Sequence, residues 1–236
     1  MTILQTNDFH GLLSEPMARQ IRALKDAEDA LYFDCGDCIK TGNLGIPLRR
    51  EVAWDRLTLA GCDGSVLGNR ETHVLTSAFE AKVNGASQPI FCANLRSKAG
   101  QPSFVSPSKI IEKDELRIGI FGVMVAMVTE RMATKKASAY IWDDPHEVAK
   151  QEVAALRPQC DVLIALTHIG HRQDILLAEK CPEIDVILGG HSHTVLQKPD
   201  LIGKTQIFQA GSHGRFVGRY EFSGTKLRES QLIALA

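Results

Sequence analysis

The sequence lacks an excess of basic residues, a long hydrophobic run and a leader of the secretory type. Lysine and arginine total 27 against 28 acidic residues, so the formal net charge is −1, and no broad basic surface for a nucleic-acid polymer or a membrane is expected. The longest nearly continuous apolar run, residues 118–128, is too short to span a bilayer. Because the N-terminus has no basic start followed by an apolar stretch, we predict no signal peptide and expect a cytoplasmic protein.

The rest of the composition is ordinary for a folded protein, apart from its histidines. The chain has 236 residues, of which 44% are hydrophobic and 23% charged, and this balance excludes a disordered chain. We see neither a repeat nor a linker, so we expect one domain over residues 1–236. The six cysteines are spread along the chain and are expected to be thiols in a reducing cytoplasm. Eight histidines are present, and several of them are clustered.

Short apolar runs alternate with amphipathic segments along the chain. Ser14 is the predicted N-cap of one helix, Asp144 begins another, and a third is predicted over residues 48–60, ended by Gly61. Residues 215–222 and 227–235 predict a β-hairpin, which indicates a mixed sheet within an α/β fold. Strands are predicted over residues 2–6, 30–34, 64–67, 90–93, 116–121, 161–166, 185–188 and 206–209.

Five of the eight predicted strands are followed by polar side chains beside glycine. Ligand sites gather at the carboxyl ends of strands in α/β folds, and glycine lets a side chain leave a strand sharply. Taken singly, each of these segments is an ordinary turn or helix cap, but their joint occurrence after strands predicts a metal site. The seven candidate ligands are Asp8, His10, Asp37, Asn69, His168, His191 and His193.

Four imidazoles, two carboxylates and one amide are more ligands than one ion needs, but they suit two ions that share a carboxylate. Mixed nitrogen and oxygen ligands favour Mn, Fe, Zn, Co or Ni over Ca or Mg. Two divalent ions and two aspartates leave a charge of about +2, which fits a hydroxide and a phosphate ester. The positive field for an anionic substrate would then come from metal rather than from lysine or arginine.

Five short segments contain the candidate ligands, and two further segments belong to the same pattern. In chain order the seven segments are residues 6–11, 36–37, 68–69, 93–95, 166–171, 189–194 and 209–211. Their order resembles the calcineurin-like metallophosphoesterase superfamily, and more narrowly the catalytic domain of the bacterial 5'-nucleotidase/2',3'-cyclic phosphodiesterase branch. The resemblance covers nearly the whole chain. It implies a four-layer αββα fold, in which two mixed sheets pack face to face with helices outside.

The same resemblance divides the seven candidates into two metal sites that share a bridging carboxylate. The implied reaction is hydrolysis of a small phosphate monoester or diester, in which a metal-bridging hydroxide attacks phosphorus in line. The alternative is a non-catalytic protein of the same fold that serves as an interaction scaffold. The implied ligands are Asp8, His10 and His193 for one metal, Asn69, His168 and His191 for the other, and Asp37 for both.

Arg70 departs from the family pattern, which usually has histidine directly after the asparagine ligand. An arginine can stabilise charge on a phosphoryl oxygen, but its guanidinium cannot donate a proton to the leaving group. We therefore assign Arg70 to phosphate binding, with a surface ion pair to Glu71 as the alternative. His73 and His171 are the candidate proton donors, and supporting or surface roles are the alternative for both.

A second departure concerns substrate recognition. The 5'-nucleotidases carry a further C-terminal domain that stacks the nucleobase, and this sequence covers the catalytic portion and little else, so base recognition by that route is not expected. Asn94 and His213 are candidate substrate-binding residues, and an ordinary loop position is the alternative for His213. Cys35 and Cys38 have the spacing of a redox or zinc pair, but we favour Cys35 as a buried strand residue and Cys38 as an oxidation-sensitive thiol near the site.

Overall fold

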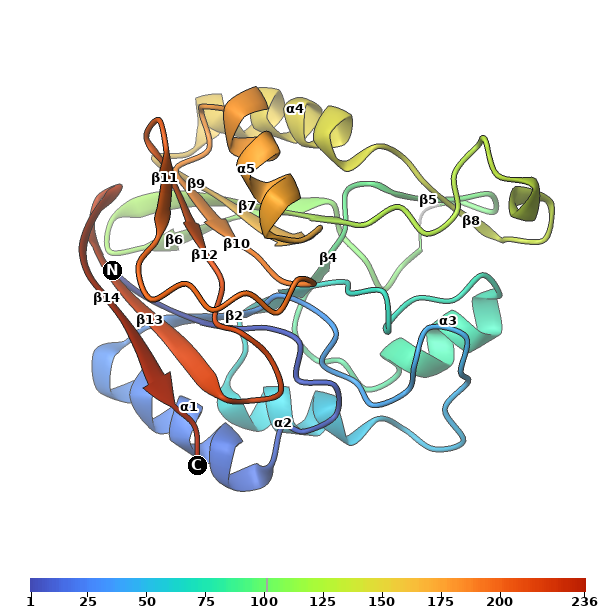
Figure 1. Cartoon of the computed structure of the whole chain (residues 1–236), viewed down its shortest axis with the longest axis horizontal. Coiled ribbons are helices and arrows are strands. Elements are labelled where there is room, and N and C mark those ends of the chain that lie inside the picture. Colours follow the sequence, from blue (N-terminus) through green and yellow to red (C-terminus); the bar gives the residue numbers. More distant parts are fainter. Residues whose placement is uncertain (101) are drawn as a thin grey trace.

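Two six-stranded sheets form the middle of the molecule, and helices cover their outer faces (Figure 1). The computed structural model describes residues 1–100 and 102–236. The strand orders are β14-β13-β1-β2-β3-β4 and β11-β12-β10-β9-β7-β6, and both sheets mix parallel with antiparallel neighbours. Helices α1, α2 and α3 lie on one side of the pair of sheets, and α4 and α5 lie on the other. The four-layer mixed α/β fold is therefore confirmed.

The bounds of the elements agree with most of the predicted segments. The strands are β1 Thr2–Thr6, β2 Leu31–Asp34, β3 Gly64–Val66, β4 Ile90–Phe91, β5 Leu95–Ser97, β6 Ser108–Lys113, β7 Leu116–Met124, β8 Tyr140–Trp142, β9 Val162–His168, β10 Val186–Leu188, β11 Asp200–Ile202, β12 Thr205–Phe208, β13 Phe216–Ser223 and β14 Lys226–Ala234. The helices are α1 Glu15–Glu28, α2 Val52–Ala60, α3 Thr76–Val83, α4 Pro145–Leu156 and α5 His171–Lys180, with two short 3-10 turns, Ala133–Lys136 and Arg157–Gln159.

Side chains of a buried strand alternate between the core that separates the two sheets and the core beneath the helices. In β9, Val162, Ile164 and Leu166 pack in the core between the two sheets. The intervening Leu163 and Ala165 pack instead in the core shared with α4 and α5. Because successive side chains of a strand point to opposite faces, a strand that is apolar throughout is buried on both faces.

Capping residues fix where two of the helices begin, as predicted. The Ser14 hydroxyl accepts a hydrogen bond from the Met17 N–H, and the Asp144 carboxylate accepts from the N–H groups of His146 and Glu147. These bonds satisfy N–H groups that have no partner inside the helix. Within the described part of the chain, no helix combines the length and apolar character needed to cross a membrane.

The prediction of a helix starting at residue 48 was wrong, because α2 begins at Val52. The buried Glu51 carboxylate accepts hydrogen bonds from the N–H groups of Lys40 and Thr41. This contact ties the segment before α2 to the loop that follows β2, and Glu51 itself is extended. The other elements that were not predicted are α3, α5, β5, β6, β8 and β11.

Parallel pairing brings the predicted site segments together. β1, β2 and β3 are parallel neighbours in one sheet, and β7, β9 and β10 are parallel neighbours in the other. The loops after β1, β2, β3 and β10 and the last residue of β9 carry all seven candidate ligands. Because parallel strands end at the same edge of a sheet, ligands from segments far apart in the sequence meet there.

Candidate metal centre

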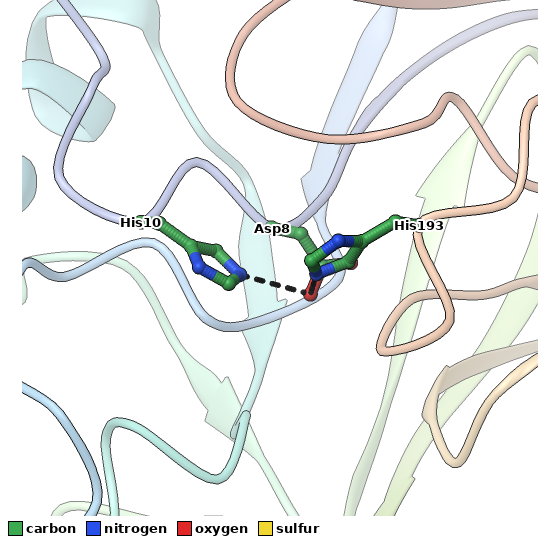
Figure 2. A group of neighbouring side chains, drawn as sticks. All are labelled: Asp8, His10 and His193. Carbon is green, nitrogen blue, oxygen red and sulfur yellow. Dashed lines mark hydrogen bonds and ion pairs between the residues drawn. The ribbon is translucent and has the colours of Figure 1, made fainter.

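The first group of ligands consists of Asp8, His10 and His193, and both histidines face one oxygen of Asp8. Figure 2 shows the rings of His10 and His193 directed toward the Asp8 carboxylate. His10 Nε2 and His193 Nε2 each lie 3.4 Å from Asp8 Oδ1. The other oxygen, Oδ2, accepts hydrogen bonds from the Asn7 amide at 2.8 Å and from the His191 N–H at 2.9 Å. These two donors fix the carboxylate so that Oδ1 faces the two imidazoles.

The carboxylate of Asp37 spans two groups of ligands. Its Oδ2 lies 3.7 Å from His10 Nε2 in the first group. Its Oδ1 lies 3.5 Å from His168 Nε2 in the second. A carboxylate placed in this way can offer one oxygen to each of two neighbouring ions.

The second group of ligands consists of Asn69, His168 and His191, and their acceptor atoms lie close together. Asn69 Oδ1 lies 3.3 Å from His168 Nε2 and 3.0 Å from His191 Nδ1, and the two ring nitrogens are 3.3 Å apart. His168 Nδ1 is 2.7 Å from the Cys35 carbonyl oxygen, so in a neutral ring Nδ1 carries the proton and Nε2 presents a lone pair. The Asn69 amide donates to Asn43 Oδ1 at 2.9 Å, which leaves its oxygen facing the rings.

These separations fit metal ligation. Nitrogen and oxygen ligands about 2.0–2.2 Å from an ion lie about 3.0–3.6 Å apart in tetrahedral or octahedral shells. Asp8, His10 and His193 form one set of ligand atoms within 4.8 Å of one another, and Asp8, Asp37 and His168 form another. Lone pairs that point at each other repel unless a cation lies between them, so the residues present fit bound divalent cations.

The backbone of the site is held in an uncommon conformation. Asp8, His10, Asp37, His191 and His193 all have φ between 54° and 76°. Residues other than glycine rarely adopt this left-handed region, and each instance costs energy that the surrounding structure must supply. Such clustering of strained positions is typical of functional sites.

Glycines make room for the loops to approach one another. Gly36 has φ of +85°, and a Cβ there would lie 2.7 Å from the Gly68 nitrogen and 2.9 Å from His168 Nδ1. The absence of a side chain therefore lets the loops after β2 and β3 meet beside a candidate ligand.

Electrostatics at the site favour bound positive charge. Burial alone would raise the pKa of Asp8, but the hydrogen bond with His10 and the neighbouring His168 ring hold it below its ordinary value. Burial alone would lower the pKa of His168, but the negative charges of Asp37 and Asp8 raise it. The raised pKa of His168 shows a negative potential at its ring, and the lowered pKa of Asp8 keeps that carboxylate ionised.

Glu71 is a functional residue that the sequence reasoning did not identify. Its buried carboxylate accepts hydrogen bonds from the N–H groups of Asp37 and Gly68, both at 2.9 Å, and of Ile39 at 3.2 Å. The alternative of a surface ion pair between Arg70 and Glu71 is therefore wrong. Glu71 instead joins the loops that carry Asp37 and Asn69.

Arg70 lies beside the carboxylate of Asp37. Its N–H donates to Asp37 Oδ1 at 2.7 Å, and its side-chain Nε is 3.7 Å from Asp37 Oδ2. Its Nη1 donates to the Lys40 carbonyl at 3.0 Å. The side chain is 27% exposed, so its other donors are accessible to a ligand.

The rings of the two candidate proton donors are engaged by partners other than the predicted ligands. His171 is the first residue of α5, and its Nε2 pairs with Asp200 Oδ2 at 2.7 Å. His73 Nδ1 accepts a hydrogen bond from the Leu75 N–H, and the residue lines a mostly apolar cavity. The structure therefore does not bring these histidines to the predicted ligands.

Asn94 was wrongly predicted to bind substrate. Its amide nitrogen donates to the carbonyls of Met124 and Asp143, and its oxygen accepts from the Met124 N–H. The residue is buried, so its polar groups serve the protein itself. His213, by contrast, lies at the first group, where its ring centroid is 4.8 Å from that of His10 and 5.5 Å from that of His193.

The two neighbouring cysteines have structural positions. Cys35 is buried, as predicted, and its thiol donates to the Leu188 carbonyl at 3.2 Å. Cys38 is buried in the apolar core, and burial raises its pKa well above the ordinary value. A thiol that is neither accessible nor ionised reacts poorly with oxidants, so the prediction that Cys38 is oxidation-sensitive was wrong.

Comparison with known proteins shows relatives along nearly the whole chain. The 5'-nucleotidase of Vibrio cholerae is 30% identical over 283 residues, covering 96% of this chain and 50% of the relative. The trifunctional nucleotide phosphoesterase YfkN of Bacillus subtilis is 28% identical over 265 residues, covering 94% of this chain and 18% of the relative. The uncharacterized metallophosphoesterase YunD of the same organism is 28% identical over 243 residues, covering 98% and 51%. No protein-family model matches the chain.

Solved structures show the same fold. A 5'-nucleotidase precursor from Thermus thermophilus has a TM-score of 0.80 at 20% identity, covering 100% of this chain and 54% of that one. The calcineurin-like phosphoesterase YfkN from Bacillus subtilis has a TM-score of 0.75 at 19% identity, covering 100% and 90%. The chain spans about half or less of the curated relatives described above. Sequence and fold together show that the chain is a relative of the calcineurin-like metallophosphoesterases.

Proposed function

We propose that the protein is a dinuclear metal-dependent phosphoesterase that hydrolyses a small phosphate monoester or diester. The observation that carries this proposal is the placement of Asp37, whose two oxygens face His10 and His168 in two different ligand groups. The names of the relatives, 5'-nucleotidase and nucleotide phosphoesterase, support a nucleotide-like or another small phosphorylated substrate. The bridging role of Asp37 and the choice of substrate are parts of the proposal.

Two divalent ions held by the seven ligands would polarise the phosphoryl oxygens and lower the pKa of a water molecule that attacks phosphorus. The chain's own groups then position the substrate. The Arg70 guanidinium, beside Asp37, would bind a phosphoryl oxygen and stabilise charge that develops there. His213 lies beside His10 and His193 and would contact the substrate at the edge of the first group.

The rigidity of the site comes from residues that touch no substrate. Asn7 holds Asp8, Glu71 holds the backbone of Asp37, and the Cys35 carbonyl holds the ring of His168. Groups held in this way keep their orientation while the reaction proceeds, so less reorganisation is needed in the transition state.

Asp37→Asn tests the proposal, with Asp26→Asn as its matched control. Asp26 lies on the exposed face of α1 and pairs with Arg22, so its substitution should change neither metal content nor activity. We expect wild-type protein to bind two metal ions per chain by elemental analysis and to hydrolyse nitrophenyl phosphate with added Mn²⁺. Asp37→Asn should weaken both metal sites together and remove most of the activity. Near-full activity in this variant would refute the bridging role.

The non-catalytic scaffold remains the second candidate function, because Arg70 stands where the family has a histidine. The same measurements separate the two candidates. Metal-free wild-type protein that stays inactive with Mn²⁺ would favour the scaffold and overturn the proposed function.

A further inference from the structure

A mostly apolar cavity of about 210 Å³ is lined by residues that follow Arg70 along the chain and by the loop around Leu44. Its wall includes Leu44, Val74, Met127 and Val128, together with the buried Trp142. None of these residues belongs to the proposed metal ligands. A pocket with apolar walls and a few polar groups is the usual form of a small-molecule site.

Two wall residues connect this cavity to the metal centre. Asn43 lines the cavity, and its Oδ1 accepts the hydrogen bond from the Asn69 amide at 2.9 Å. Thr72 also lines it, and its hydroxyl donates to the Asn69 carbonyl at 2.9 Å. The cavity therefore shares a wall with a residue that we expect to bind metal, on the same loop as Arg70.

Lys82 holds the two walls in place. This buried ammonium donates to the carbonyls of Gly42 and Asn43 on one loop, at 2.8 and 3.1 Å. It also donates to the carbonyls of Arg70 and Thr72 on the other loop, at 2.7 and 3.0 Å. Because one cation joins both loops, the cavity is formed before any ligand arrives, which lowers the entropic cost of binding.

One apolar side chain of the cavity is exposed. Leu44 lines the cavity and is 89% exposed, whereas Val128 and Trp142 are buried. Burial and the nearby Lys82 ammonium lower the pKa of His73, another wall residue, which favours its uncharged form. An exposed leucine at the opening of an uncharged cavity gains free energy when an apolar ligand covers it.

We propose that this cavity, built around Leu44, Val74 and Trp142 beside Asn69, binds the leaving group of the substrate and selects esters whose leaving group carries a single apolar ring. This inference rests on the proposed function, because it assigns the leaving-group side of the same site. Size supports it, since an apolar cavity of about 150 Å³ is large enough to bind benzene. The mainly apolar wall would favour a ring over a charged or hydroxylated group of the same length.

The first test compares two non-hydrolysable inhibitors that differ only in the ring. Benzylphosphonate and ethylphosphonate are assayed as competitive inhibitors of nitrophenyl phosphate hydrolysis, so leaving-group acidity does not enter the comparison. We expect benzylphosphonate to inhibit wild-type protein at least about tenfold more strongly. Thr134→Phe, at an exposed position on the cavity wall, should fill the cavity and remove this preference. Thr225→Phe, at an exposed position in the β13–β14 turn, is the matched control and should retain it.

The second test does not depend on activity. The chain has two tryptophans, Trp54 in the core and Trp142 at the cavity, so their indole N–H signals in NMR report on two places. Phenol added to about 10 mM, where even a millimolar site is mostly filled, should shift the Trp142 signal and leave that of Trp54 in place. Thr134→Phe should abolish the shift.

The two tests separate this inference from the proposed function. If wild-type protein hydrolyses no ester but phenol shifts the Trp142 signal, the proposed function fails and the cavity still binds an apolar ring. If hydrolysis occurs but Thr134→Phe leaves the ratio of the two inhibition constants at the wild-type value, the leaving-group assignment is overturned. An unshifted Trp142 signal overturns the cavity as a ring site.

Discussion

Replacing Glu71 by glutamine tests whether the metal centre depends on a residue that is not itself a predicted metal ligand. The carboxylate accepts three backbone N–H bonds, two on Oε2 from Asp37 and Gly68 and one on Oε1 from Ile39. A glutamine oxygen can keep the first two, but the amide NH₂ then faces the Ile39 N–H, so donor meets donor. The loss of one bond to a charged acceptor costs about 1.5–3 kcal/mol.

A second effect of the same substitution has the opposite sign. Burial raises the pKa of Glu71, and the charge of Asp37 raises it further, so the ionised side chain is held at a cost that glutamine removes. The lost hydrogen bond to Ile39 and the removed cost of burying a charge partly cancel. We therefore expect the free energy of unfolding to change by less than about 2 kcal/mol. The metal centre has no such compensation, since the backbone of Asp37 loses a charged acceptor.

Metal affinity should therefore fall while the fold persists. Substitutions behind a metal ligand typically weaken metal binding about 10–100-fold, which corresponds to about 1.4–2.8 kcal/mol. The assay is competition for Mn²⁺ with a fluorescent chelator, together with urea unfolding. Glu80→Gln, at an exposed position on α3, is the matched control. Affinity within twofold of wild type in Glu71→Gln would refute the reasoning.

Three further predictions follow from other contacts. Arg70→His should raise the rate on ethyl phosphate relative to nitrophenyl phosphate, because imidazole can protonate an alkoxide leaving group and guanidinium cannot; an unchanged ratio of the two rates would contradict this. Lys82→Met should lower the free energy of unfolding in urea by about 3 kcal/mol, because four carbonyls lose their donor, and a loss below about 1 kcal/mol would contradict the role of this cation. Burial raises the pKa of Asp174 to about 7, so the stabilisation from its protonated form is present in acid and lost as the pH rises through 7. Asp174→Asn should thus gain stability over wild type between about pH 5 and pH 8, by at most about 4 kcal/mol, and parallel unfolding curves against pH would rule this out.

The parts of the fold that the sequence predicted are those whose signal is local. Each predicted strand is an apolar run buried on at least one face, and Ser14 and Asp144 cap their helices through groups two or three residues away. Helix α5 was not predicted because most of its side chains are polar, and Leu177 and Ala178 supply most of its buried apolar face. Its position depends on packing against the second sheet, which no short window of sequence contains.

The same distinction applies to the site. The candidate ligands stand directly at strand ends, and the pairing of parallel strands brings them to one edge of each sheet. The supporting groups act across long separations: Glu71 bonds the Asp37 backbone 34 residues away, and Lys82 bonds the Gly42 carbonyl 40 residues away. Such contacts leave no spacing that a single sequence can reveal. His73 and His171 were singled out for their residue type near the motifs, and the local loop geometry turns both toward other partners.

The near-neutral net charge of the chain hides a strong local imbalance. The carboxylates of Asp8, Asp37 and Glu71 are all buried at the site. The ammonium of Lys82 donates hydrogen bonds to four carbonyls. Arg70 is then the principal cation that faces Asp37. Without bound cations the centre would repel a phosphorylated substrate, whereas two divalent ions reverse the sign of its field. On the proposed function, metal must therefore bind before substrate, and the affinity for an anionic ester is set by metal occupancy rather than by the surface charge of the protein.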